Sequence, residues 1–271
     1  MKQLIAAVAL VLSFSAAAAD TELQQALAGS HREPANVARD GFRHPAETLA
    51  FFGLKPNQTV VEIWPGGGGW YTEILAPYLK ANGKFYAAHF DPNSTSDYYK
   101  KNLAAYQAKL AAKPEIYGKV ELTVFNPPTQ LAVAPAGSAD LVLTFRNVHN
   151  WWMRGGGDAN VQASFKAMFT ALKPGGVLGV VEHRLPAARP DSDQEKSGYM
   201  HEAYVIKMAE SVGFKLAAKS EINANSKDNA DHENGVWALP PTLTNGDKDR
   251  EKYLAIGESD RMTLKFVKPG K

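Results

Sequence analysis

Short apolar runs alternate with amphipathic helical patterns along most of the chain. Runs of this kind, bounded by Gly, Pro or Asn, are typical of buried strands. Strands are predicted over residues 59–64, 84–90, 120–125, 139–145, 177–182, 214–220 and 262–267, and helices over residues 45–53, 70–81, 96–113, 158–172 and 198–212. This alternation favours βαβ units around a parallel sheet. We therefore expect an α/β fold, a doubly wound seven-stranded sheet, in one domain over residues 20–271.

The first residues have the pattern of a secretory signal peptide. Met1-Lys2 supplies a basic start, Leu4 to Phe14 is apolar, and Ala16 to Ala19 are small. Such a segment is cleaved on export, here after Ala19, and it is too short for a lasting membrane anchor. The alternative is a buried N-terminal helix. We expect residues 1–19 to be the signal peptide and the protein to be periplasmic or secreted.

Composition limits the classes of partner. The chain is 45% hydrophobic and 21% charged, with a formal net charge of +2 and no cysteine. No block of like charges occurs, which argues against a nucleic-acid or anionic-membrane partner. The lack of cysteine fits an oxidising compartment. The oligomeric state is left open, and a small molecule is the expected partner.

A glycine-rich loop, Gly66 to Gly69, follows the first predicted strand. Glycine lets a backbone approach a ligand closely because it has no Cβ. Glu62, before the loop, can accept hydrogen bonds from loop amides or from a ligand amine. The third glycine of a dinucleotide fingerprint would fall on Tyr71, which argues against a nicotinamide cofactor.

Three segments resemble class I S-adenosylmethionine-dependent methyltransferases, and in particular an exported branch of predicted methyltransferases. They are Val61 to Leu75, Leu172 to Val177 (Leu-Lys-Pro-Gly-Gly-Val) and Asp260 to Pro269. The resemblance implies the Rossmann-like fold of that class and S-adenosylmethionine as cofactor. The cofactor-binding residues that it implies are Glu62, Trp64, Gly66, Gly67, Gly68, Asp91 and Asn126.

The sequence departs from the family pattern at three of its ligand positions. Trp64 stands where the family has its first loop glycine, and a left-handed backbone there would cost about 1–2 kcal/mol. His89 holds the place of the ribose-binding carboxylate, which Asp91 could replace from the same side of the strand. Asn126 stands where many relatives place an aspartate.

Candidate catalytic residues follow the fourth predicted strand, where the resemblance places groups that face the transferable methyl. His149 is a candidate general base because its unperturbed pKa lies near neutrality. Asn150 is its neighbour. Trp151 or Trp152 could line the substrate pocket and attract the sulfonium of the cofactor through a cation–π interaction. A structural interpretation stays open for each: the tryptophans fill the core and the histidine caps a loop.

Three other histidines fall near the same predicted rim: His44, His183 and His201. They suit an acid–base substrate pocket. They could instead hold a metal such as zinc with Glu182 or Glu202. No His-Glu-x-x-His spacing occurs, so no metal ligand is assigned.

The leading hypothesis is therefore a methyltransferase that acts on an unidentified small molecule. One alternative is a periplasmic binding protein that keeps the crevice for another ligand, with Trp64 blocking the methionine end of the site. The other is a metal-dependent enzyme built on the histidines. An exported methyltransferase needs a supply of cofactor, because a charged sulfonium made in the cytoplasm does not cross a membrane unaided.

Overall fold

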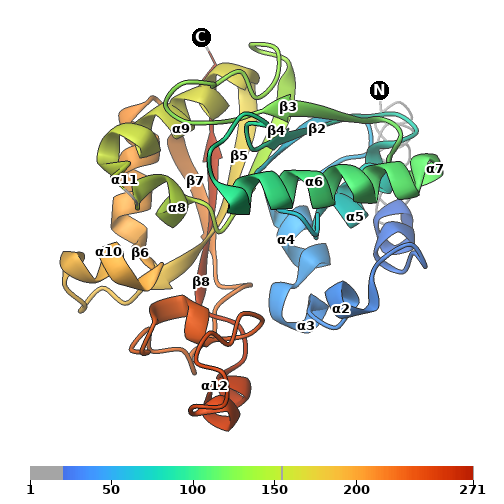
Figure 1. The fold of residues 1–271 in the computed structure, drawn as a ribbon. Coiled ribbons are helices and arrows are strands. Elements are labelled where there is room, and N and C mark those ends of the chain that lie inside the picture. Colours follow the sequence, from blue (N-terminus) through green and yellow to red (C-terminus); the bar gives the residue numbers. More distant parts are fainter. Residues whose placement is uncertain (1–20, 154, 271) are drawn as a thin grey trace, which may run out of the picture.

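A computed structural model describes residues 21–153 and 155–270 (Figure 1). The predicted signal peptide, residues 1–19, lies outside the described residues. None of the described helices is long and apolar enough to cross a membrane.

The core of the molecule is a mixed sheet with the order β3-β2-β1-β4-β5-β8-β7. All neighbouring strands are parallel except β8, which runs antiparallel to both β5 and β7. The short β6 pairs with the end of β5. The predicted doubly wound α/β sheet is thus confirmed. The strands are β1 Thr59–Ile63, β2 Lys84–His89, β3 Val120–Val124, β4 Ala139–Phe145, β5 Leu172–Leu185, β6 Met200–His201, β7 Lys215–Ser220 and β8 Arg261–Val267.

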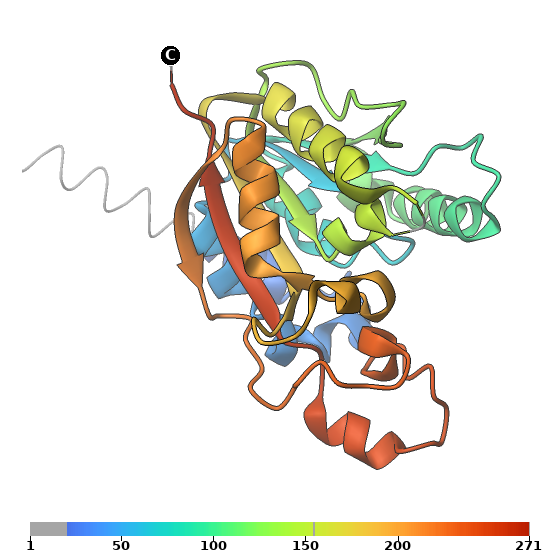
Figure 2. The ribbon, with the colours of Figure 1, turned by 90° about the vertical axis from the view of Figure 1, so that its left-hand side faces the viewer.

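Helices cover both faces of this sheet, as the perpendicular view in Figure 2 shows. The longer ones are α4 Pro45–Phe52, α5 Thr72–Leu79, α6 Asp97–Ala112, α9 Gly157–Ala171 and α11 Glu202–Ser211. The shorter ones are α2 Pro34–Val37, α3 Asp40–Arg43, α7 Pro114–Tyr117, α8 Val148–Trp152, α10 Gln194–Ser197 and α12 Arg250–Ile256, with 3-10 turns at Asp191–Asp193 and Gly235–Ala238.

The alternation of side chains along β1 builds two hydrophobic cores. Val61 and Ile63 pack in the cluster that contains Phe165 of α9, whereas Val60 packs in the cluster that contains Phe52 of α4. Successive side chains of a strand point to opposite faces, so one short strand contributes to both layers. A Cβ at Gly179 of β5 would lie 2.7 Å from the Phe52 ring, which explains why glycine is needed where α4 crosses the sheet.

The predicted bounds of strands and helices differ from the structure mainly in the region that follows β5. Strand β5 extends to Leu185 and pairs there with Met200–His201, so the helix predicted over residues 198–212 begins only at Glu202. Residues 186–197, between β5 and β6, contain a 3-10 turn and α10.

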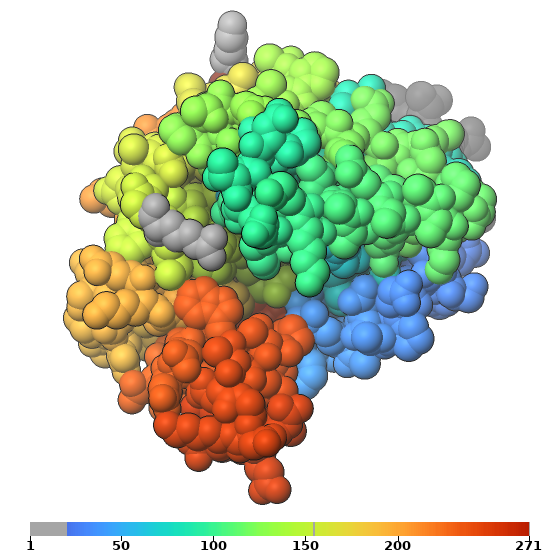
Figure 3. Space-filling model, viewed as in Figure 1, coloured from blue at the N-terminus to red at the C-terminus, as the bar shows by residue number. Residues whose placement is uncertain are grey.

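Residues 221–260 form a lobe below the sheet in Figure 1, drawn in orange and red in Figure 3. This lobe is anchored rather than loose. Asn223 is buried and donates to the hydroxyls of Thr48 and Thr263 at 3.0 Å.

Candidate functional site

A cavity of about 440 Å³ lies at the carboxyl ends of β1, β4 and β5. In doubly wound sheets this edge is where ligands bind, and the volume suits a small molecule. The lobe supplies one wall and the loops after the strands supply the others. The lining residues are Trp64, Pro65, Gly66, Phe90, Tyr98, Tyr99, Phe145, Arg146, Asn147, His149, Asn150, His183, Val236, Trp237, Pro240, Pro241, Thr242, Glu258 and Ser259.

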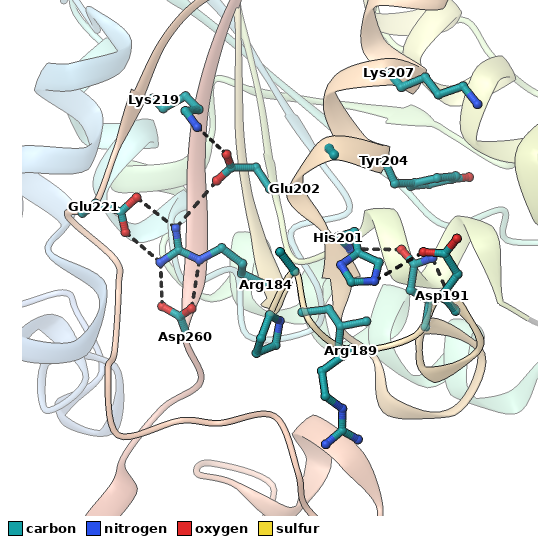
Figure 4. A pocket seen from close by; sticks show the side chains of 15 residues that line it. Arg184, Arg189, Asp191, His201, Glu202, Tyr204, Lys207, Lys219, Glu221 and Asp260 are labelled. Carbon is teal, nitrogen blue, oxygen red and sulfur yellow. Dashed lines mark hydrogen bonds and ion pairs between the residues drawn. The ribbon is translucent and has the colours of Figure 1, made fainter.

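A larger groove of about 830 Å³ lies beside the end of β5 (Figure 4), and several of its charges are paired with one another. Arg184 bonds Asp260 through Nε at 2.9 Å and Glu221 through Nη2 at 2.7 Å. His201 lies here, 3.4 Å from Asp191, and not in the strand-end cavity. Because its main cation is already neutralised, this groove is the weaker candidate.

The glycine-rich loop begins with a strained tryptophan. Trp64 has φ 48°, the left-handed conformation in which the family pattern has glycine. Its buried indole donates from Nε1 to the carbonyl of Phe125 at 2.8 Å and lies 4.9 Å from the ring of Phe90. The side chain therefore lies over the ends of β2 and β3 and forms part of the cavity wall.

The three predicted loop glycines differ in their surroundings. Gly66 has φ 71° and lines the cavity, and a Cβ there would meet nothing within 4 Å. Gly67 packs against Asn102, whose side-chain oxygen accepts from its amide at 3.0 Å. Gly68 is exposed and does not line the cavity. Only Gly66 offers an open approach to a ligand from this wall.

The polar residues that the resemblance assigns to the cofactor lie outside the cavity lining. Glu62 is buried under the loop, where it accepts from the Thr72 hydroxyl at 2.9 Å, and burial raises the pKa of its carboxyl to about 8. Asp91 accepts from the amide of Asn93 and from the side chain of Gln130.

The end of β2 and the segment that follows β3 likewise place no carboxylate in the cavity lining. Asn126 makes a backbone bridge with Gln130 and does not line the cavity. His89 is fully buried, its Nδ1 accepts from the amide of Phe90 at 2.8 Å, and burial lowers its pKa to about 4. His89 is thus a neutral core residue near pH 7.

His149 and Glu182 form the main acid–base pair of the cavity. The Nδ1 atom of His149 lies 2.9 Å from Oε1 of Glu182, and both side chains are buried. The second carboxylate oxygen accepts from the amides of Val148 and His149, at 2.6 and 3.3 Å. Because Nδ1 is held by the carboxylate, Nε2 is left for the cavity that the ring lines.

His183 lies beside this pair and Asn150 lines the same cavity, but the other two candidate histidines lie elsewhere. The His149 and His183 rings are 5.3 Å apart, and Nδ1 of His183 lies 2.6 Å from the Ser259 hydroxyl. Burial, and then the neighbouring His149, lowers the pKa of His183 well below its usual value. His44 borders another hollow, near Asn223, so the four candidate histidines do not gather in one place.

Within the described residues, one group has spacing suited to a metal ion: the donor atoms of His149, Glu182 and His183 lie within 4.8 Å of one another. Glu182, however, already accepts four hydrogen bonds. Three come from the backbone amides of Val148, His149 and His183, and one comes from the His149 ring. Its geometry is that of a group that orients a histidine.

The comparisons with known proteins agree with this architecture. No protein-family model and no curated protein matches the sequence. A SAM-dependent methyltransferase from Aquifex aeolicus superposes with a TM-score of 0.55 at 13% identity, over 92% of this chain and 98% of that one. The [4+2]-cyclase SpnF gives a TM-score of 0.54 at 15% identity, over 84% and 81%. Phosphoethanolamine N-methyltransferase 2 from Haemonchus contortus, in complex with S-adenosyl-L-methionine, gives 0.52 at 16%, over 84% and 53%. The chain has the methyltransferase fold.

In this methyltransferase fold the cavity wall includes aromatic residues that sequence reasoning missed. Trp151 is a core residue, 1% exposed, and its ring lies 6.0 Å from that of Phe165. Trp152 does not line the cavity. Trp237 of the lobe does, and its ring lies 6.2 Å from the His149 ring. No local pattern could have predicted this, because the lobe joins the site through tertiary folding alone.

Proposed function

We propose that this protein is a S-adenosylmethionine-dependent methyltransferase that acts on a small molecule, with His149 as the proton acceptor. The observation that carries the proposal is the His149–Glu182 pair facing a cavity at the carboxyl ends of the strands. The fold of the neighbours supports the reaction class as an analogy, and the pair supports the chemistry.

The cavity offers two features that fit the cofactor. Gly66 leaves open space at a left-handed backbone position, so a ligand can approach the main chain there. Phe90, Tyr98 and Tyr99 line the cavity as neighbours, with the Phe90 ring 6.3 Å from that of Tyr98 and 4.3 Å from that of Tyr99. Aromatic rings stack with a flat base and attract a cation. The cofactor supplies a methyl group bound to a sulfonium sulfur. Since no carboxylate from β2 reaches the cavity, these rings and the loop backbone would carry most of its binding.

The chain's own residues supply proton transfer and positioning. Glu182 fixes the tautomer of His149 by holding Nδ1, so that the free Nε2 can accept a proton from a hydroxyl, amine or thiol of the acceptor. Asn150 and Trp237 also line the cavity and can position the acceptor. Alignment of the two reacting groups is the main source of rate in a displacement of this kind.

Calorimetric titration of the mature protein with S-adenosylmethionine and with its demethylated product tests the proposal. We expect micromolar binding that falls at least about tenfold in Gly66→Val, because the new side chain would project into the cavity. Gly137→Val is the matched control: Gly137 is exposed, has φ 65°, and a Cβ there also meets nothing within 4 Å. It introduces the same backbone strain away from the site.

Lack of binding to both compounds by the folded wild-type protein would refute the methyltransferase function and leave the fold unaffected. Equal weakening in both glycine variants would show that strain, and not the cavity, controls the affinity. Methyl transfer itself is then measured with cofactor labelled in the methyl group.

We also propose that the protein works outside the cytoplasm, because residues 1–19 have the pattern of a signal peptide. Cell fractionation and N-terminal sequencing test this: a mature chain that begins at Asp20 in the periplasmic fraction is expected. A full-length chain in the cytoplasmic fraction would contradict it and would remove the problem of cofactor supply.

A further inference from the structure

Four arginine side chains surround one carboxylate beside the cavity. Glu258 is 2.6 Å from Nε of Arg39, 3.2 Å from Nε of Arg43 and 3.1 Å from Nη2 of Arg261. The fourth, Arg146, follows β4 and lines the cavity together with Glu258. The arginines come from α3 and its preceding turn, from the residue after β4 and from the start of β8, so the cluster is built by the tertiary fold.

The positive charge of this cluster exceeds the negative charge. Arginine stays protonated in proteins. Burial alone would raise the pKa of Glu258, but the guanidinium groups of Arg43 and Arg261 and the hydrogen bond from Arg39 lower it to about 2, so it is ionised. One carboxylate therefore faces four guanidinium groups. Glu62, which also interacts with Arg146, has a pKa of about 8 and is mostly neutral at pH 7.

Two buried donor atoms of the cluster are unsatisfied within the described residues: Nη1 of Arg43 and Nη2 of Arg39. The Arg43 side chain is only 2% exposed. A buried charge is costly unless it is paired and hydrogen-bonded. Arg39 and Arg43 do not line the cavity, and the Arg43 guanidinium group lies 4.7 Å from the Trp70 ring centroid. Their charge is therefore not balanced by carboxylates, and an anion bound at the cavity wall would offset it.

Arg146 is the member of the cluster that a ligand can reach. It borders the cavity, and no hydrogen bond or ion pair within the described part of the chain occupies its guanidinium group. Its backbone has φ 61°, a left-handed conformation that is unfavourable for arginine. Strain of this kind at a cavity wall is characteristic of functional sites.

We propose that the cavity binds an anionic group, a carboxylate or a phosphate, on the guanidinium group of Arg146, and that this group belongs to the methyl acceptor. A guanidinium group presents a planar fork that matches both anions. Assignment of the anion to the acceptor rests on the proposed function, whereas binding of the anion does not. His149 and Arg146 line the same cavity, so a substrate held at its anionic end would lie in the same space as the proton acceptor.

The experiment uses inorganic phosphate as the probe. Thermal unfolding of the mature protein is followed with increasing phosphate, and with chloride at matched ionic strength. A ligand that binds only the folded state raises the midpoint in proportion to its affinity. We expect phosphate, and not chloride, to stabilise the wild type, and the affinity to fall at least about tenfold in Arg146→Gln.

Two further variants serve as controls. Arg146→Lys keeps the charge but loses the fork, so its loss of affinity should be smaller than that of Arg146→Gln. Arg250→Gln removes an exposed arginine of α12, away from the cavity, and should bind phosphate as the wild type does. Equal phosphate stabilisation in wild type and Arg146→Gln, or none in the wild type, would overturn the anion site.

Titration of Arg146→Gln with S-adenosylmethionine separates the two proposals. Unchanged cofactor affinity together with lost phosphate binding supports an anionic acceptor. A parallel loss of cofactor affinity would assign Arg146 to the carboxylate of the cofactor and overturn the acceptor assignment. If no form binds the cofactor while phosphate binding still requires Arg146, the proposed function fails and the anion site stands.

Discussion

Replacement of Trp64 tests whether the strained start of the loop is maintained by packing. The indole is 9% exposed, donates to the Phe125 carbonyl at 2.8 Å and packs 4.9 Å from the Phe90 ring. Loss of a buried tryptophan side chain costs about 3–5 kcal/mol. The left-handed backbone at φ 48° costs a non-glycine residue about 1–2 kcal/mol, and glycine relieves it.

The packing of the indole raises the free energy of unfolding and the backbone strain lowers it. A pair of variants separates the two effects. Trp64→Ala loses the packing and keeps the strain, so its free energy of unfolding should fall by about 3–5 kcal/mol. Trp64→Gly loses the packing and relieves the strain, so the decrease should be smaller, about 1–4 kcal/mol after the relief of about 1–2 kcal/mol. Glycine should thus be more stable than alanine here, the reverse of its usual effect inside regular structure.

Urea unfolding followed by circular dichroism measures both differences, with the slope compared between variants to confirm two-state behaviour. A Trp64→Gly protein as stable as the wild type would refute the packing role of the indole. A glycine variant less stable than the alanine variant would show that this residue does not need the left-handed conformation.

Three further predictions concern buried groups. His149→Ala should abolish methyl transfer and leave S-adenosylmethionine affinity nearly intact in calorimetry; full activity or lost binding would exclude the general-base role. Glu182→Gln should lower kcat by at least about 10²-fold with little change in KM, because the histidine loses the carboxylate that fixes its tautomer; a changed KM alone would contradict this. His89 takes up a proton near pH 6.5 when unfolded but only near pH 4 when folded, so it should lower the free energy of unfolding by about 3 kcal/mol as pH falls through that window. Urea unfolding at pH 7 and pH 4.5 checks this, and the pH dependence should weaken in His89→Gln.

The fold could be predicted wherever the signal is local. Strand β4, Ala139–Phe145, has the predicted bounds, and α4 ends as expected at Gly53, which adopts φ 81°. The extension of β5 to Leu185 could not be predicted, because it depends on pairing with Met200–His201. Pairing of distant segments leaves no trace in the periodicity of either one.

The sequence predicted the sheet edge at which the site lies, but not which residues line the cavity there. His149 and His183 do lie together, as their places after β4 and at the end of β5 imply. His201 follows the same edge but faces another groove. The position of a residue at the end of a strand determines the sheet edge on which it lies. It does not determine which of the cavities at that edge the side chain enters. Glu258 and Trp237 were missed because they reach the cavity from the lobe.

Two residues that follow adjacent strands have strained, left-handed backbones, and their side chains indicate different reasons for it. Trp64 follows β1 and Arg146 follows β4, the paired neighbour of β1, and both have left-handed backbones. The buried indole of Trp64 accounts for its retention. Arg146 is bonded through its backbone, to the carbonyl of Val181 and to the side chain of Asn150, but within the described residues its guanidinium group has no hydrogen bond or ion pair that would offset about 1–2 kcal/mol of strain. Arg146→Gly should therefore raise the free energy of unfolding, since it removes both the strain and a like charge among the arginines, and it should lose phosphate binding. A variant that is less stable than the wild type in urea unfolding would show that Arg146 is retained for folding and not for a ligand.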